Sequence, residues 1–188
     1  VFRPDEKLER LIRQLNSQTR KPDHIWFMQT LADPEEDGRV RRMLEMADGG
    51  EIVPVARGEF DHGGTRNRGA SLSKADYLLF MTQDAVPVDG VLVERLYERL
   101  ASDARIAVAY ARQLPGDGVG PVEQYTRQFN YPDKSNVKDI GDLDRLGIKT
   151  YFCSNVCAMY RRDKYEELGG FVRHTIFNED MIFASAVI

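Results

Sequence analysis

The sequence predicts an α/β fold in which a mostly parallel, twisted sheet is flanked by helices. Apolar runs of strand length alternate with segments of helical periodicity, as in parallel α/β proteins. The central run, residues 77–81, is apolar throughout, which is typical of a strand that is buried on both faces. Thr82, Gln83 and Asp84 follow it at once, and ligands of open α/β sheets bind at the carboxyl ends of strands.

The elements of the first half follow in order. A helix over residues 4–18 has Leu8, Leu11, Ile12 and Leu15 on one face, and Pro4 suits its first turn. The next elements expected are a strand at 24–28, a helix at 35–47, a strand at 52–55, a helix from 64 or 65 to 73, the central strand, a helix at 91–100 and a strand at 106–111.

The second half is less regular. The weak pattern of residues 113–147 predicts a long loop, which either has a function or is only a solvent-exposed connection. Residues 151–160 predict a strand or strand pair interrupted by Ser154 and Asn155, followed by a short helix at 163–168 and a loop at 171–177. Asn178 would cap a last helix over 181–188. Glu179 and Asp180 suit its first turn through the helix dipole, and this is the purely structural interpretation of both acids.

The composition and charge of the chain argue against several classes of function. A chain of 188 residues with 42 % hydrophobic and 30 % charged residues can form one globular domain. Its net charge of -4 argues against nucleic-acid binding, and no apolar run approaches the length of a membrane span. Cys153 and Cys157 lack the partners of a zinc site and are expected to be small buried residues. Because the sequence starts without Met and ends inside a predicted helix, residues 1–188 are expected to be one domain cut at both ends.

Two segments carry candidate ligand-binding residues. Asp84, at the end of the central strand, is placed to hold a hard cation or merely to cap the next helix. Residues 60–70 place Gly63 and Gly64 before a helix start with Arg66 and Arg68 nearby, which is a plausible diphosphate site. His62 lies in the same segment, and the alternative to a role in ligand binding is that it is a turn residue bonded to the backbone.

Taken in order, these motifs resemble glycosyltransferase family 2, which has the GT-A fold, and specifically its bacterial rhamnosyltransferase-like members. The similar stretches are Gln18-Thr19, residues 64–69 with Arg66 and Asn67 (Ala-Arg-Asn-x-Gly in the family), Thr82-Gln83-Asp84 (Asp-x-Asp), residues 168–171 (Gly-Gly-Phe) and Glu179-Asp180 (Glu-Asp). Thr82 replaces the first acid of Asp-x-Asp, and Gln29-Thr30 replaces an acidic pair that helps to hold the nucleotide base. The family's first strand would end near Phe2, so we expect most of it, and the part after the last helix, to be absent from residues 1–188.

The resemblance implies an inverting transfer of a sugar from a nucleotide-diphosphate donor to a hydroxyl. It makes Asp180 the catalytic base, with Glu179 as runner-up, and Asp84 the ligand of a divalent cation, Mg²⁺ or Mn²⁺. The donor contacts expected are Phe2, Gln29, Arg66, Asn67, Gln83 and Asp84, and the acceptor contacts expected are Ser154, Asn155 and Glu179.

The resemblance also implies the partners. Rhamnose from a dTDP donor is expected first and a UDP-sugar next, with a cell-surface polysaccharide or lipid-linked saccharide as acceptor. Such enzymes are cytoplasmic and work at the inner face of the membrane, which implies peripheral membrane association. The alternatives are a domain that binds or hydrolyses a nucleotide-sugar without transfer, a noncatalytic interaction module in which the acids are only caps, and a nucleotidyltransferase.

Overall fold

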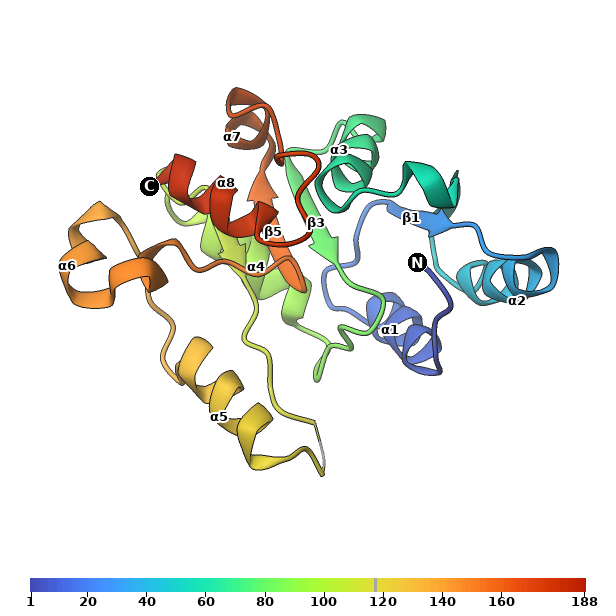
Figure 1. The fold of residues 1–188 in the computed structure, drawn as a ribbon, viewed down its shortest axis with the longest axis horizontal. Helices are drawn as coiled ribbons and strands as arrows, with labels where there is room; N and C mark the ends of the chain where they lie inside the picture. The colour runs from blue at the N-terminus through green and yellow to red at the C-terminus, as the bar shows by residue number, and fades with distance from the viewer. Residues whose placement is uncertain (117) are drawn as a thin grey trace.

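In the computed structural model, which describes residues 1–116 and 118–188, two small sheets lie side by side with helices packed on their faces (Figure 1). The elements are α1 (Lys7–Asn16), β1 (Ile25–Thr30), α2 (Pro34–Leu44), β2 (Gly50–Val55), η1 (Arg57–Glu59), α3 (His62–Leu72), β3 (Tyr77–Met81), α4 (Leu92–Ala101), β4 (Val108–Tyr110), α5 (Pro121–Asn130), η2 (Ile140–Asp142), α6 (Leu143–Leu146), η3 (Gly147–Tyr151), β5 (Cys157–Arg161), α7 (Arg162–Glu167) and α8 (Glu179–Val187).

The first sheet is the parallel pair β1 and β2, in which Ile25 lies opposite Gly50 and Thr30 opposite Val55. Phe27 of β1 packs among the buried apolar residues of α1 and α2. On the other face of β1, α3 approaches so closely that a Cβ on Gly69 would lie 3.4 Å from the sulfur of Met28. The predicted strand–helix–strand alternation is confirmed in this part of the chain.

The second sheet has the order β3-β5-β4, with β5 antiparallel to both neighbours. Met81 of β3 pairs with Cys157, and Tyr110 of β4 pairs with Ala158. The α/β fold is therefore as predicted, but the expected parallel pairing holds only for β1 and β2. A short apolar run such as residues 157–160 carries no information on strand direction, which depends on residues far away in the sequence.

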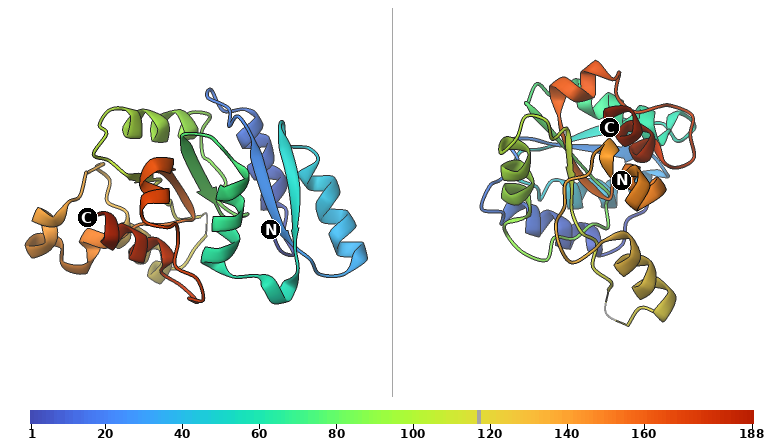
Figure 2. Two further views of the ribbon diagram at one scale, coloured as in Figure 1. Left: turned by 90° about the horizontal axis from the view of Figure 1, so that it is seen from above. Right: turned by 90° about the vertical axis from the view of Figure 1, so that its left-hand side faces the viewer.

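Both faces of the second sheet are covered, as the apolar sequence of β3 predicts. Cys157 and Met159 of β5 face the apolar side of α4, whereas Ala158 and Tyr160 face a cluster that includes residues of α3, α7 and α8. This alternation is the two-residue period of a strand. Figure 2 shows α4 and α8 on opposite sides of β3 and β5.

The first two residues connect the two sheets. The Val1 nitrogen donates to the Met28 carbonyl oxygen at 2.5 Å, and the Thr30 N–H donates to the Val1 carbonyl oxygen at 2.8 Å. The side chain of Gln83 accepts from the Phe2 N–H at 2.7 Å and donates to the Phe2 carbonyl oxygen at 3.0 Å. Residues 1 and 2 thus join the carboxyl end of β1 to the residues that follow β3.

Three expectations from the sequence need correction. The predicted loop over residues 113–147, of which residue 117 lies outside the described part, contains α5, η2 and α6. Helix α5 has no buried residue and extends away from the sheets (Figure 1). Residues 152–156 form no strand, and Asn178 precedes α8 in a left-handed conformation (φ 71°) without a side-chain cap hydrogen bond. Within residues 1–116 and 118–188, no helix combines the length and hydropathy needed to cross a membrane.

Candidate active site

Three segments meet beyond the carboxyl end of β3. The backbone N–H of Thr82 donates to the carbonyl oxygen of Val156 at 3.1 Å. The next residue towards the N-terminus, Asn155, donates its backbone N–H to Oδ2 of Asp180 at 2.9 Å. The segment before β5 therefore links the end of the central strand to the first turn of α8. Asp84 and Asp180, far apart in the sequence, are brought to the same end of the sheet.

The Asp180 carboxylate is half-buried and held by two backbone donors. Oδ2 accepts from Asn155, and Oδ1 accepts from the N–H of Met181 at 2.8 Å. Burial raises the pKa of Asp180 above its usual value, and the neighbouring charge of Glu179 acts in the same direction. The two N–H bonds and the charge of Arg66 oppose this shift without cancelling it. A raised pKa makes a carboxylate a stronger proton acceptor than an ordinary aspartate.

Glu179 points inward rather than toward solvent. Its side chain is 7 % exposed, and Oε1 accepts from Nη1 of Arg66 at 2.9 Å and from Nδ2 of Asn155 at 3.2 Å. Asn155 is itself buried. Both residues are expected acceptor contacts, but the structure has them bonded to each other. Ser154, the third expected contact, is also buried, and its hydroxyl accepts from Nε2 of Gln113 at 3.0 Å.

Arg66 contacts Glu179, whereas the sequence predicts that it faces donor phosphates. Its Nη1 donates to Glu179 and to the carbonyl oxygen of His62 at 3.1 Å. Among the described residues, no hydrogen bond engages its Nε or Nη2, and the side chain is 18 % exposed. The guanidinium group can therefore hold Glu179 through one nitrogen and still offer donors to an anion.

Asn67 holds the Gly-Gly-Phe loop. Its Oδ1 accepts from the N–H of Phe171 at 2.8 Å and from the hydroxyl of Tyr165 at 2.5 Å, and its Nδ2 donates to the Phe171 carbonyl oxygen at 2.8 Å. Gly170 has a φ of +76°, and a Cβ there would lie 2.7 Å from Oδ1 of Asn67. In the structure Asn67 therefore has a structural role in holding this loop, and its expected donor contact stays a prediction.

The start of α3 does not form the predicted diphosphate site. Asp61 caps this helix, because its carboxylate accepts from the N–H of Gly64 at 2.5 Å and from the N–H of His174 at 2.9 Å. The hydrogen bond from Gly64 has the largest effect in lowering the pKa of Asp61, and the bond from His174 lowers this pKa further. A Cβ on Gly63 would lie 1.9 Å from the carbonyl oxygen of Val172. The helix start is already occupied by a carboxylate, and Gly63 permits close packing against the loop rather than against a ligand.

The expected donor contacts differ in their access to solvent. Gln29 is 1 % exposed, and its Nε2 donates to the Asp37 carbonyl oxygen at 3.3 Å, so it faces α2 rather than a ligand. Gln83 is engaged by the backbone of Phe2. The Phe2 ring is exposed, and the guanidinium carbons of Arg3 and Arg57 lie 5.5 Å and 5.7 Å from its centroid. Of these three side chains Gln29 is buried, Gln83 is partly exposed but bonded to Phe2, and Phe2 is exposed.

Asp84 is exposed, and its carboxylate makes no hydrogen bond with the described part of the chain. It lines a broad groove of about 1220 Å³ that continues past Tyr110, Tyr131 and Val187. Within residues 1–116 and 118–188, no group of three or more His, Cys, Asp or Glu side chains could enclose a metal ion. A hard cation that takes most of its ligands from phosphates and water needs only one or two carboxylates, so Asp84 fits this kind of site.

Sequence reasoning misses one residue behind the acids. The hydroxyl of Tyr160, on β5, donates to Oδ1 of Asn155 at 2.8 Å and lies 3.5 Å from the sulfur of Cys153. A tyrosine in an apolar run predicts only a core residue, so no local signal could have identified it. Cys153 and Cys157 are buried and unbridged, as predicted, and burial raises the pKa of each thiol to about 12.

Comparison with known proteins identifies similar sequences. The family described as Glycosyl transferase family 2 matches residues 2–169. The O-antigen chain rhamnosyltransferase RfbN of Salmonella typhimurium is 46 % identical over 138 residues, and WbaN of Salmonella anatum, which has the same description, is 41 % identical over 138 residues. Each match covers 73 % of this chain and 44 % of the relative, so the chain spans less than half the length of these proteins.

Among solved structures, the fold is similar to that of the mannosyltransferase PcManGT from Pyrobaculum calidifontis, determined in complex with GDP-Man and Mn²⁺. The TM-score is 0.69 at 14 % sequence identity, and the match covers 100 % of this chain and 49 % of that chain. At this identity the likeness concerns the fold alone.

Proposed function

Because this chain belongs to glycosyl transferase family 2 and has its GT-A fold, we propose that it is the catalytic part of an inverting rhamnosyltransferase. It transfers rhamnose from a nucleoside-diphosphate donor to a saccharide hydroxyl. The observation that carries this proposal is the Asp180 carboxylate, which is held by two backbone donors at the carboxyl end of the sheet and has a raised pKa. The choice of rhamnose is supported by the relatives described as O-antigen chain rhamnosyltransferases.

In this mechanism Asp180 accepts the proton of the acceptor hydroxyl. As the hydroxyl oxygen bonds to the anomeric carbon, the bond from that carbon to the diphosphate breaks on the opposite face, which inverts the configuration. The N–H groups of Asn155 and Met181 hold the carboxylate in position throughout. Arg66 compensates the charge of Glu179, so the second acid does not force Asp180 to stay protonated.

The leaving diphosphate needs positive charge near it. A bound Mg²⁺ or Mn²⁺ would stabilise the negative charge of the leaving group, and Asp84 is the side chain that would hold it. The free Nε and Nη2 of Arg66 add donors for a phosphate oxygen. The exposed ring of Phe2, flanked by Arg3 and Arg57, is the candidate contact for the nucleotide base.

For the acceptor we propose a lipid-linked saccharide that is extended at the cytoplasmic face of the membrane. The relatives are described as O-antigen chain rhamnosyltransferases, and this description supports a saccharide acceptor of this class. The groove beside Asp84 is large enough for a saccharide, and Tyr110 and Tyr131 lie along it. Ser154 lies next to Asn155 and accepts a hydrogen bond from Gln113, and we retain it as a candidate acceptor contact.

Acceptor-dependent turnover tests the function. The full-length protein is incubated with radiolabelled dTDP-rhamnose, with and without lipid-linked saccharides extracted from bacterial membranes. We expect label to enter the saccharide, and release of dTDP to rise with acceptor concentration. Equal release of dTDP with and without acceptor would identify a hydrolase instead, and no release with any donor would support a noncatalytic domain.

Nucleotide binding tests the metal ligand separately. We expect calorimetric titration of dTDP into the full-length protein to show binding in the presence of Mn²⁺ that weakens at least tenfold in Asp84→Ala. Asp76→Ala is the matched control, because Asp76 is also exposed but lies before the opposite end of β3. A parallel titration with UDP decides which base is preferred. Equal binding by wild type and Asp84→Ala would remove Asp84 from the metal site.

A further inference from the structure

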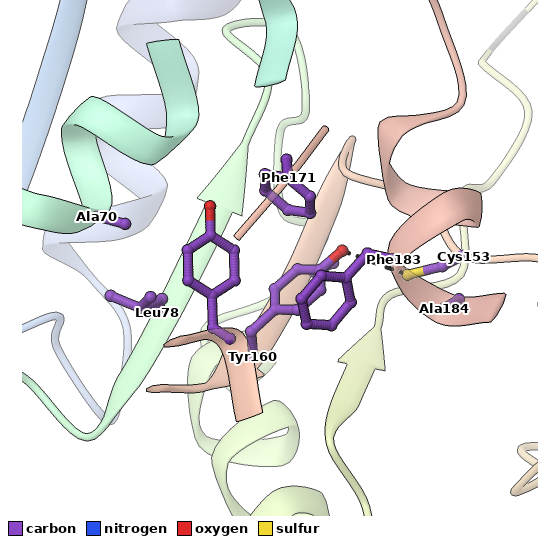
Figure 3. Close-up of a cluster of buried hydrophobic side chains, with 9 residues drawn as sticks. Ala70, Leu78, Cys153, Tyr160, Phe171, Phe183 and Ala184 are labelled. Atoms are coloured by element: carbon purple, nitrogen blue, oxygen red, sulfur yellow. Dashed lines mark hydrogen bonds between the residues drawn. The ribbon is translucent and has the colours of Figure 1, made fainter. Parts of the chain in front are cut away.

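A directed chain of hydrogen bonds lies behind the two acids. Asn155 donates to both of them, with its backbone N–H to Asp180 and with its side-chain amide to Glu179. The hydroxyl of Tyr160 contacts the other end of the same amide at 2.8 Å. The Tyr160 hydroxyl also lies 3.5 Å from Sγ of Cys153 (Figure 3).

The direction of each bond in this chain follows from chemistry. An ionised carboxylate accepts only, so the amide must turn its NH₂ group to Glu179 and its oxygen to Tyr160. The Tyr160 hydroxyl must then donate to that oxygen, which leaves its own oxygen free to accept from the Cys153 thiol. Burial raises the pKa of both Tyr160 and Cys153, so each keeps the proton that this chain requires.

The Tyr160 side chain cannot turn away from this position. It is completely buried, and its ring centroid lies 5.5 Å from that of Phe80, 5.3 Å from Phe171 and 5.1 Å from Phe183. Figure 3 shows the rings of Tyr160, Phe171 and Phe183 packed together in the core. A hydroxyl on a ring held from several sides gives Asn155 a fixed reference point.

We infer that Tyr160 is a positioning residue, which fixes the Asn155 amide and thereby holds Glu179 and Asp180 in the orientation that catalysis requires. This inference rests on the proposed role of Asp180. Removing the hydroxyl leaves the amide free to rotate, so Glu179 loses a donor and the N–H bond from Asn155 to Asp180 loosens. The weaker N–H bond disfavours the ionised form of Asp180, and its pKa rises.

The decisive variant is Tyr160→Phe, which removes one oxygen atom and keeps the ring. In the full-length protein, we expect carbon NMR titration of the Asp180 carboxyl, assigned by its loss in Asp180→Asn, to show a midpoint about half a pH unit to one unit higher than in wild type. The acid limb of turnover with dTDP-rhamnose should move by the same amount, with the KM for donor unchanged within about twofold.

Tyr165→Phe is the matched control. Tyr165 is a buried tyrosine of the same aromatic cluster, but its hydroxyl donates to Asn67 and contacts neither acid. We expect it to leave the titration midpoint of Asp180 unchanged. If Tyr160→Phe does not fold, Asn155→Asp serves instead, because it keeps the shape and the backbone N–H but replaces the donor facing Glu179 by an acceptor. It should raise the midpoint further.

The outcomes separate the inference from the proposed function. An Asp180 midpoint in Tyr160→Phe or Asn155→Asp equal to that of wild type would overturn the positioning role and leave the base assignment intact. If Asp180→Asn retains turnover, the base assignment fails. The NMR titration still decides whether Tyr160 controls the acids, since it needs no activity.

Discussion

The backbone N–H of Asn155 donates to Oδ2 of Asp180 over 2.9 Å and joins the entry of β5 to the first turn of α8. This contact matters because Asn178, at the cap position of α8, makes no side-chain cap hydrogen bond. The start of α8 is therefore fixed by the two acids and their partners rather than by a cap. The same bonds that would only stabilise an ordinary helix here orient a carboxylate at the ligand-binding end of the sheet.

The first prediction concerns the pH dependence of turnover. Burial raises the pKa of Asp180 above the usual 3.8, so this carboxylate, the proposed base, becomes protonated at a higher pH than an exposed aspartate. We expect the acid limb of the turnover profile to have its midpoint above 3.8. Stability depends on pH in the opposite direction to turnover. Because folding raises the pKa of Asp180, its protonated form stabilises the fold. This contribution is present below the pKa of the unfolded state and is lost as the pH rises through the pKa of the folded state. An acid limb at or below 3.8 would show that Asp180 does not limit the rate.

The second prediction concerns the pair formed by Arg66 and Glu179. Because both side chains are largely buried, we expect a double-mutant cycle with Arg66→Ala and Glu179→Ala to give a coupling free energy of about 1–3 kcal/mol in urea unfolding. The exposed pair of Lys21 and Asp48 is the control, and its coupling should be close to zero. Equal coupling in both pairs would mean that Arg66 contributes nothing to holding Glu179.

The third prediction concerns the two bonds made by Asp61. We expect Asp61→Ala to lower the free energy of unfolding by more than the about 1 kcal/mol of a lost N-cap, because it also frees the N–H of His174. Asp33→Ala is the matched control, since Asp33 caps α2 through one bond to Glu36. Chemical denaturation measures both variants. An equal loss in the two variants would show that the bond to His174 adds no stability.

The fourth prediction concerns Gly63. A methyl group there would overlap the carbonyl oxygen of Val172, which is backbone and cannot rotate away. We expect Gly63→Ala to destabilise the fold by about 3 kcal/mol, at the upper end of overpacking effects. Gly58→Ala, at a position with no atom within 4 Å of the added Cβ, should change stability by less than about 0.5 kcal/mol. A harmless Gly63→Ala would mean that the loop after α7 does not pack on α3 in solution.

Local sequence signals predicted the elements that a periodic or continuous apolar pattern defines. The amphipathic face of α1 and the apolar run of β3 appear where periodicity placed them. The antiparallel insertion of β5 between β3 and β4 could not be predicted in this way, because strand pairing is decided by residues more than forty positions away. Helix α5 escaped prediction because glycines precede it and no residue of it is buried.

In the candidate site, too, some features could be predicted from the sequence and others could not. The position of Asp180 at the start of the last helix follows from sequence, and so does that of Asp84 after the central strand. The inward orientation of Arg66, Asn67 and Glu179 depends on partners from distant segments, and single residue types do not specify such partners. For the same reason, the glycines before α3 suggested a phosphate site although Asp61 already occupies the helix start.

The most direct test of the central claim is the turnover of Asp180→Asn in the full-length protein. With dTDP-rhamnose and a lipid-linked saccharide acceptor, we expect the rate of rhamnose transfer to fall by at least about a hundredfold, in the range of a lost general base, because the amide cannot take the proton. Binding of dTDP, measured by calorimetry on the same sample, should stay within about twofold of wild type. A variant that binds dTDP normally and transfers rhamnose at nearly the wild-type rate would contradict the assignment of Asp180 as the base.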